Sequence, residues 1–238
     1  APGAESLEKN PCFLYRLIFV QFFSCIVEKR MGHPFMKKST GSRLTEKQLA
    51  LFPGDTLFHK IARAVCRAGT LPGKELFEAW EVARRVRRKY RGGRVVDLAC
   101  GHGLLAHIML LLDDSSKEAL AVDLDFTENA KRLSGIIVDR WPRLKNRIHH
   151  IRSRAEAMDL DSRDIVVSVH ACGRLTDRII ETAVHARARL AVLPCCHDLK
   201  TGDLGGLDGW MEGSLAMDAT RAAQLRANGY EVITRIIP

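Results

Sequence analysis

The feature that most constrains the fold is a regular alternation of strand-like and helix-like segments from residue 94 onward. Short apolar runs rich in β-branched residues alternate there with amphipathic segments. Such an alternation favours a parallel sheet covered by helices on both faces, and the handedness of its crossovers leaves a doubly wound α/β fold. The predicted strands are 94–98, 119–124, 147–151, 164–169, 190–193 and 230–237, and the predicted helices are 104–112, 127–140, 175–188 and 214–228.

Residues 1–93 precede this alternation, and we expect them to form a helical, basic extension to a domain of residues 94–238. One helix is predicted from a cap at Asp55 to Ala68, where Gly69 ends it, and a second from Pro72 to the glycine pair at 92–93. Apolar residues at spacings of three and four predict a buried face on the second helix, made of Leu76, Phe77, Trp80, Ala83 and Val86.

The apolar segment 12–27 is short for a transmembrane helix, which needs about 20 residues, and Arg16 and Gln21 interrupt it. It also lacks a convincing secretory signal. We therefore expect an amphipathic helix packed on the domain rather than a membrane anchor. The 7 cysteines form no CxxC pair, which favours a reducing compartment and a cytoplasmic location.

The charge is unevenly distributed along the chain. The net charge is +9, but residues 1–94 hold 19 Lys+Arg against 8 Asp+Glu, and the remainder holds 18 against 20. The densest basic run begins at Arg84 and ends at Arg94. This excess predicts a polyanionic partner for the extension, although a solvated helix end explains such a run equally well.

The first predicted strand runs into a glycine-containing turn, VVDLACGHGL. Gly101, Gly103 and Ala106 fit the GxGxx(G/A) pattern of dinucleotide sites, with Asp123 at the next strand end as the ribose ligand. The turn also resembles the first motif of class I methyltransferases, an acid followed after three residues by Gly-x-Gly. That resemblance implies that Asp97 holds the cationic methionine end of S-adenosylmethionine (SAM). A carboxylate beside a pyrophosphate is unfavourable, so the electrostatics favour SAM.

The same resemblance implies the other cofactor contacts. Ala99 belongs to the glycine turn, Asp123 with Leu124 takes the ribose, and Asp125 is a second candidate for the ribose. Beside adenine many class I methyltransferases have an acidic and a small residue, but Arg154 stands where the acid is usual. We therefore expect adenine to be bound through the backbone amide of Ala155, next to Glu156, and His170 to border the cofactor.

Two further motifs follow the fourth and fifth predicted strands: VHACGRLTD at 169–177 and LPCCH at 193–197. They resemble the HxCGxxTD and CCH motifs of a methyltransferase family that includes the eukaryotic tRNA 2′-O-methyltransferases acting on the acceptor stem. The resemblance covers residues 75–198 and implies SAM as cofactor and RNA, above all tRNA, as substrate. From its basic charge, we expect the segment 84–94 to bind that RNA. It departs from that family at Asp198, where a further His is usual, and in lacking the N-terminal zinc-finger spacing.

The residues of these motifs permit several chemistries. His170 and His197 suit a general base that takes a proton from a hydroxyl or amine nucleophile. Cys195 or Cys196 could instead attack a pyrimidine as a thiolate. Convergence of these residues on Zn²⁺ is disfavoured because adjacent Cys-Cys-His is poor spacing, so we expect no metal, and Cys172 to be a buried small hydrophobe.

Two other functions stay open on the sequence: an NAD-type oxidoreductase, and a non-catalytic RNA-binding domain on a methyltransferase fold. The number of strands is also open in one respect. Class I methyltransferases usually have a seventh, antiparallel strand beside the sixth, whereas residues 94–238 supply six. We expect either that the seventh strand is missing or that the segment 12–27 covers the gap.

Overall fold

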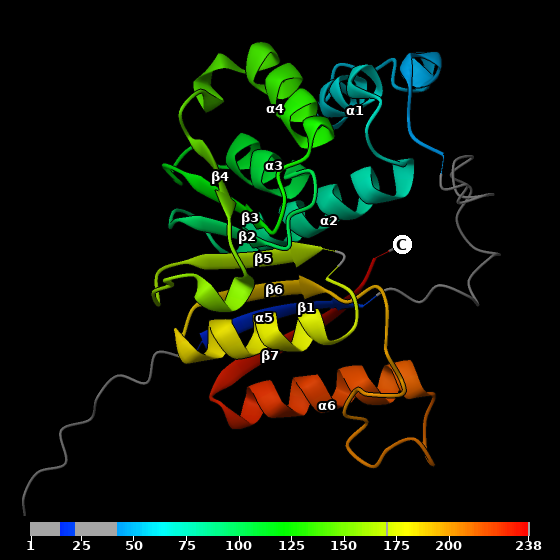
Figure 1. Ribbon diagram of the computed structural model, residues 1–238, viewed down its shortest axis with the longest axis vertical. Coiled ribbons are helices and arrows are strands. Elements are labelled where there is room, and N and C mark those ends of the chain that lie inside the picture. The colour runs from blue at the N-terminus through cyan, green and yellow to red at the C-terminus, as the bar shows by residue number, and fades with distance from the viewer. Residues whose placement is uncertain (1–14, 22–41, 170, 238) are drawn as a thin grey trace, which may run out of the picture.

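A parallel sheet of seven strands forms the centre of the computed structural model, which describes residues 15–21, 42–169 and 171–237 (Figure 1). The strand order is β4-β3-β2-β5-β6-β1-β7, and every neighbouring pair is parallel. The strands are β1 (Tyr15–Gln21), β2 (Val95–Leu98), β3 (Ala119–Asp123), β4 (Ile148–Arg152), β5 (Ile165–Val169), β6 (Arg189–Leu193) and β7 (Tyr230–Ile236).

Helices cover both faces of the sheet, which confirms the doubly wound α/β prediction. Successive strand residues point to opposite faces, so Val95 packs in the core with α1 to α4 and Val96 in the core with α5 and α6. Residues of α1 and α2 thus share one hydrophobic core with the strands. The helices are α1 (Leu57–Ala68), α2 (Gly73–Lys89), α3 (Leu104–Leu112), α4 (Glu128–Arg140), α5 (Arg174–His185) and α6 (Gly213–Ala227).

The predicted elements of residues 94–238 are all present, with bounds within three residues of those expected. On α1 the expected cap is wrong by one residue. Thr56 caps the helix, because its side chain accepts a hydrogen bond from the His59 N–H at 3.3 Å, while Asp55 pairs with Lys60. Gly69 ends α1 in the left-handed conformation (φ 65°), as predicted.

The expected helix over 12–27 is wrong where the structure describes that segment. Residues Tyr15–Gln21 form β1, which lies between β6 and β7 with Leu17 opposite both Leu190 and Val232. A short apolar run cannot be assigned to helix or strand by periodicity alone. Here the facing edges of β6 and β7 supply hydrogen-bond partners for its backbone, and this favours a strand. Six strands come from residues 94–238, and β1 from the N-terminal segment makes the seventh. This is the second of the two expected alternatives, in which the segment 12–27 covers the gap. The rest of 12–27 lies outside the described residues.

No helix in the described ranges is both long and apolar enough to cross a bilayer.

The basic run at the end of α2 is only partly on the surface. Arg87 is buried: its guanidinium lies 3.1 Å from the Asp113 carboxylate and donates to Met109 O and Ser116 Oγ. Burial lowers the pKa of Arg87 to about 10. Arg84 is paired with Glu81 and Arg94 with Asp164. The expectation that the whole run contacts a polyanion is therefore wrong for Arg87, because its charge is used inside the fold.

We predict a large effect on stability for one of two adjacent arginines of this run and a small effect for the other. Arg87→Gln should lower the free energy of unfolding by about 3 kcal/mol, because it removes the buried charged partner of the Asp113 carboxylate and leaves only the largely exposed Arg91. Arg88→Gln, on the exposed side of the same turn, should change it by less than about 0.5 kcal/mol. Urea denaturation measures both, and equal effects would contradict the buried role of Arg87.

Candidate functional site

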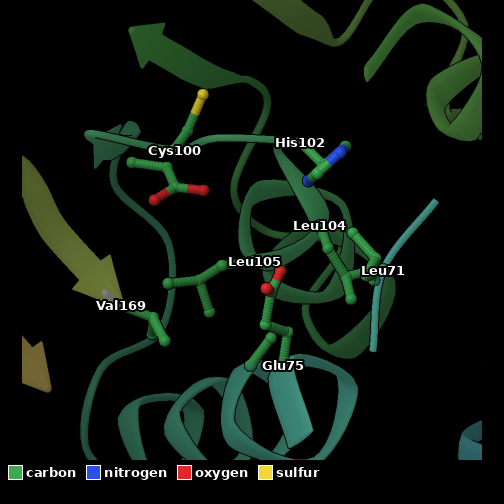
Figure 2. A pocket seen from close by; sticks show the side chains of 9 residues that line it. Leu71, Glu75, Cys100, His102, Leu104, Leu105 and Val169 are labelled. Atoms are coloured by element: carbon green, nitrogen blue, oxygen red, sulfur yellow. The ribbon is translucent and has the colours of Figure 1, made fainter. Parts of the chain in front are cut away.

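A pocket lies at the carboxyl end of β2, between the glycine turn and the start of α2 (Figure 2). The carboxyl ends of parallel strands are where open α/β sheets bind ligands. The pocket is lined by Leu71, Glu75, Ala79, Asp97, Cys100, His102, Leu104, Leu105 and Val169. The strand ends that carry the other predicted site residues border the same edge of the sheet.

The glycine turn has the backbone that the sequence predicts. Gly101 and Gly103 have φ angles of 54° and 71°, and Ala99, at 56°, is one of the few non-glycine residues with a positive φ among those described. A Cβ on Gly101 would meet no atom within 4 Å, so that glycine leaves its backbone open to a ligand. A Cβ on Gly103 would lie 3.3 Å from His150, so the second glycine permits close packing instead.

Asp97 is a buried carboxylate at the end of β2, with 1% of its surface exposed. Its Oδ2 accepts a hydrogen bond from the Ala106 N–H at 3.1 Å. Burial raises the pKa of Asp97 to about 8, and the charge of Asp123 adds to this rise although the Ala106 hydrogen bond opposes it. Within the described part of the chain this acid has no positive partner, and a cationic ligand in the pocket would supply one.

Glu75 supplies a second carboxylate to the pocket, from the first turn of α2 (Figure 2). It reaches the pocket because α2 packs against α3, the helix that follows the glycine turn. Nothing in the local sequence pattern marks Glu75, so it is not among the predicted site residues. His102 also lines the pocket, and partial burial lowers the pKa of its imidazole.

Asp123 ties the glycine turn to the next strand. Its Oδ2 accepts from the Gly101 N–H at 2.8 Å, and its Oδ1 accepts from the Leu124 N–H at 2.7 Å. A carboxylate has about four acceptor positions, so Asp123 can still accept from two ribose hydroxyls. Leu124 is exposed beside it, and Asp125 is exposed one residue further on.

The residues expected beside adenine follow β4. Ala155 is buried at the start of a short 3-10 helix, Ala155–Ala157. The exposed Glu156 pairs with Arg178 of α5 at 3.0 Å, and a backbone hydrogen bond together with that arginine lowers the pKa of its carboxyl. Their role toward adenine stays a prediction.

The two motifs after β5 and β6 meet in space. The Gly173 N–H donates to Cys196 O at 2.9 Å, and Gly173 adopts a backbone (φ 57°, ψ −132°) that favours glycine. The Cys172 Sγ lies 3.6 Å from the Cys195 Sγ, which in turn lies 3.7 Å from the Cys196 Sγ. Cys172 is exposed, so the expectation that it is a buried small hydrophobe is wrong. His170 lies outside the described residues.

A chain of polar contacts joins the last residues of the two motifs. The His197 Nε2 lies 3.0 Å from Oδ1 of the buried Asp218, and the same oxygen accepts from Arg221 at 3.2 Å. The Arg221 Nε donates to the Asp177 carboxylate at 2.6 Å. Asp218 thus places a carboxylate beside the His197 ring, although the two do not form a hydrogen bond in this geometry.

Comparison with known proteins identifies the family to which the chain belongs. A family model described as a methyltransferase domain matches residues 75–201 of the 238, and this is more than half of the chain. The chain belongs to this methyltransferase domain family. The match includes most of α2, the glycine turn and both cysteine motifs. No curated protein matches the chain.

Solved structures of similar fold are distant. The tRNA methyltransferase TrmK of Bacillus subtilis is 18% identical, with a TM-score of 0.41, over 56% of this chain and 54% of its own. The TYW2 protein of Pyrococcus horikoshii, in complex with MeSAdo, is 16% identical, with a TM-score of 0.35, over 48% of this chain and 39% of its own. The Trypanosoma brucei PRMT1 complex with AdoHcy is 21% identical, with a TM-score of 0.35, over 48% and 35%. The chain thus spans less than two thirds of each.

The buried Asp97 predicts a pH dependence of stability. Its pKa is about 8 in the folded protein and about 3.9 in an unfolded chain, so the folded state holds a proton that the unfolded state releases. The stabilisation is complete below pH about 4, falls by about 1.4 kcal/mol per pH unit, and is gone above pH about 8. The difference in unfolding free energy between the wild type and Asp97→Asn should therefore change by about 1.4 kcal/mol per pH unit between pH 5 and 8, with the wild type losing stability relative to the variant as pH rises.

Asp125→Asn is the control for this measurement, because it makes the same chemical change at an exposed side chain two residues after Asp123. A constant difference between the wild type and Asp97→Asn across pH 5 to 8 would show that Asp97 is ionised throughout.

Proposed function

We propose that the protein is a SAM-dependent methyltransferase that acts on RNA, with tRNA as the expected class of RNA. The observation that carries the cofactor assignment is the buried Asp97, which lines a pocket shared with Glu75 and has no cationic partner among the residues that the structure describes. SAM is positively charged at its sulfonium and its ammonium group, whereas the pyrophosphate of NAD is negative. Two carboxylates therefore suit SAM and oppose a dinucleotide at this position.

The residues present fit each part of SAM. Asp97 and Glu75 would face the methionine end, and the open backbone of Gly101, with Ala99 and Gly103, would border the centre of the cofactor. Asp123 and Leu124 would take the ribose, and the Ala155 amide with Glu156 the adenine. When bound, SAM supplies an electrophilic methyl group.

The chain itself must hold the acceptor and take its proton. His197, whose Nε2 lies 3.0 Å from the Asp218 carboxylate, is the candidate base that the structure describes, and His170 is the second candidate from the sequence. A thiolate nucleophile is less well supported. Burial and the neighbouring thiols raise the pKa of Cys195, so the thiol is protonated at neutral pH, and Cys196 adjoins it.

An RNA substrate would need contacts beyond the pocket. The exposed cations of the basic run lie at the other end of α2. Arg88 and Lys89 are exposed, and Arg91 keeps 65% of its side chain exposed although it contacts Asp113. Thirteen helical positions separate Glu75 from Arg88, a distance of about 20 Å along the helix. We infer that these cations are a distant anchor for the phosphate backbone, which gives affinity without selecting the methylated nucleotide.

Fragments of the cofactor test the assignment of the two acids. Asp97→Asn should weaken SAM binding about 10- to 100-fold, because a charge-assisted contact contributes about 1.5–3 kcal/mol, and should leave adenosine binding unchanged. Asp123→Asn should weaken both ligands. Asp125→Asn should weaken neither, which separates the two candidate ribose ligands. Calorimetry measures all three, and loss of adenosine binding in Asp97→Asn would contradict the assignment.

A second experiment tests the substrate. We expect labelled methyl groups from SAM to enter RNA rather than protein, and His197→Ala or His170→Ala to lower the rate. The double variant Arg88→Gln/Lys89→Gln should weaken RNA binding. It should also lower the slope of the logarithm of the binding constant against the logarithm of the salt concentration, by the amount expected for about two phosphate contacts. Lys131→Gln/Arg132→Gln on α4 is the charge-matched control. Salt-dependent RNA binding without any SAM binding would favour the non-catalytic alternative, and methylation of protein alone would exclude RNA as the substrate.

A further inference from the structure

Three thiols converge at the carboxyl ends of β5 and β6. Cys172 comes from the first loop, and Cys195 and Cys196 come from the second. Their sulfur atoms all lie within 4.8 Å of one another, with Sγ to Sγ distances of 3.6 Å from Cys172 to Cys195 and 3.7 Å from Cys195 to Cys196. Among the described residues this is the group of potential ligand side chains that is close enough to hold a metal ion.

We propose that Cys172, Cys195 and Cys196 form a three-thiolate site for Zn²⁺. The Zn–S bond is about 2.3 Å, so two thiolates of a tetrahedral site lie about 3.8 Å apart. The two measured contacts are within about 0.2 Å of that separation, and the third pair requires an adjustment of about 1 Å at most. Side-chain rotation supplies such a movement without a change in the fold.

The local fold holds the three thiols in this arrangement. The adjacent pair alone is poor spacing for one ion, which is why the sequence disfavours a metal. The third sulfur comes from the neighbouring loop, and the Gly173 N–H to Cys196 O hydrogen bond joins the two loops. The Thr176 Oγ1 fixes the first loop from its other side by donating to Ala171 O at 2.5 Å. A site that depends on two strand ends is invisible in a search for CxxC spacing.

Exposure distinguishes this cluster from ordinary packing of cysteines. Cys66 in α1 is a buried free cysteine that behaves as a small core residue. Cys172 and Cys196, in contrast, are exposed. Thiols on the surface gain little from apolar packing, and the same exposure leaves the fourth coordination position open to solvent or to a ligand. Zn²⁺ sites with three protein ligands and one open position are typical of catalytic rather than structural zinc.

The cluster follows a strand end that borders the pocket. Val169, which ends β5 three residues before Cys172, lines the pocket next to Asp97. A metal here would border the methyl acceptor, a role that rests on the proposed function, whereas the metal site itself does not.

Metal content of the reduced full-length protein tests the site. We expect one equivalent of Zn²⁺ per chain and, after exchange with Co²⁺, the near-ultraviolet absorption of thiolate-to-cobalt charge transfer. Cys172→Ser, Cys195→Ser and Cys196→Ser should each weaken Zn²⁺ binding by at least the roughly 10- to 100-fold that loss of an outer-shell partner costs. Cys66→Ala should keep the full equivalent. Circular dichroism and S-adenosylhomocysteine binding of each variant separate loss of metal from loss of fold or of the cofactor site.

Two results would overturn the proposal. One is a reduced protein that binds no Zn²⁺, in which air oxidation then yields a Cys172–Cys195 disulfide by peptide mapping; the cluster would then be a redox pair. The other is an equivalent of Zn²⁺ that persists in Cys172→Ser, which would place the ion elsewhere. Protection of Cys172, Cys195 and Cys196 from alkylation by added Zn²⁺ would support the proposal independently of the substitutions.

Discussion

The hydrogen bond between the Ala106 N–H and the Asp97 carboxylate sets the conditions for the rest of the site. It joins the end of β2 to the first turn of α3, and between them the chain must turn through Ala99, Gly101 and Gly103 with positive φ angles. The turn is held from the other side by Asp123, which accepts from the Gly101 N–H. Two carboxylates therefore shape one loop, and one of them is buried where its charge is unfavourable. A fold tolerates such a group where a ligand compensates it.

Much of the fold can be predicted from the sequence because each strand between residues 94 and 238 is a short apolar run, and parallel strands in a doubly wound sheet place their carboxyl ends together. That reasoning also brings Asp97, Gly101, Gly103 and Asp123 to one edge. It fails for β1, because an apolar segment of this length fits a helix or a strand equally well. Only the gap between β6 and β7 decides it.

The residues that the sequence misjudges all depend on packing between distant elements. Glu75 reaches the pocket because α2 packs against α3, and no local spacing indicates this. Arg87 and Arg88 are indistinguishable in the run RRVRRK, but one faces Asp113 inside the fold and the other faces solvent. Cys172 is exposed, and its sulfur contacts that of Cys195 from the neighbouring loop. Tertiary contact decides each of these roles.

The basic run is less positive on the surface of the fold than its sequence suggests. Several arginines of the basic run serve internal ion pairs with Glu81, Asp113 and Asp164, so the run is first a structural device. Its remaining exposed cations lie at one end of α2, whereas Glu75, at the other end of the helix, lines the pocket with Asp97. The proposed function would therefore use the two ends of α2 for different ligands.

The proposed function requires the pocket beside the glycine turn to bind SAM rather than a dinucleotide. Calorimetric titration of the protein with SAM, S-adenosylhomocysteine and NAD tests this requirement. We expect binding of both adenosyl ligands at one site and no measurable binding of NAD. Tighter binding of NAD than of S-adenosylhomocysteine would contradict the assignment.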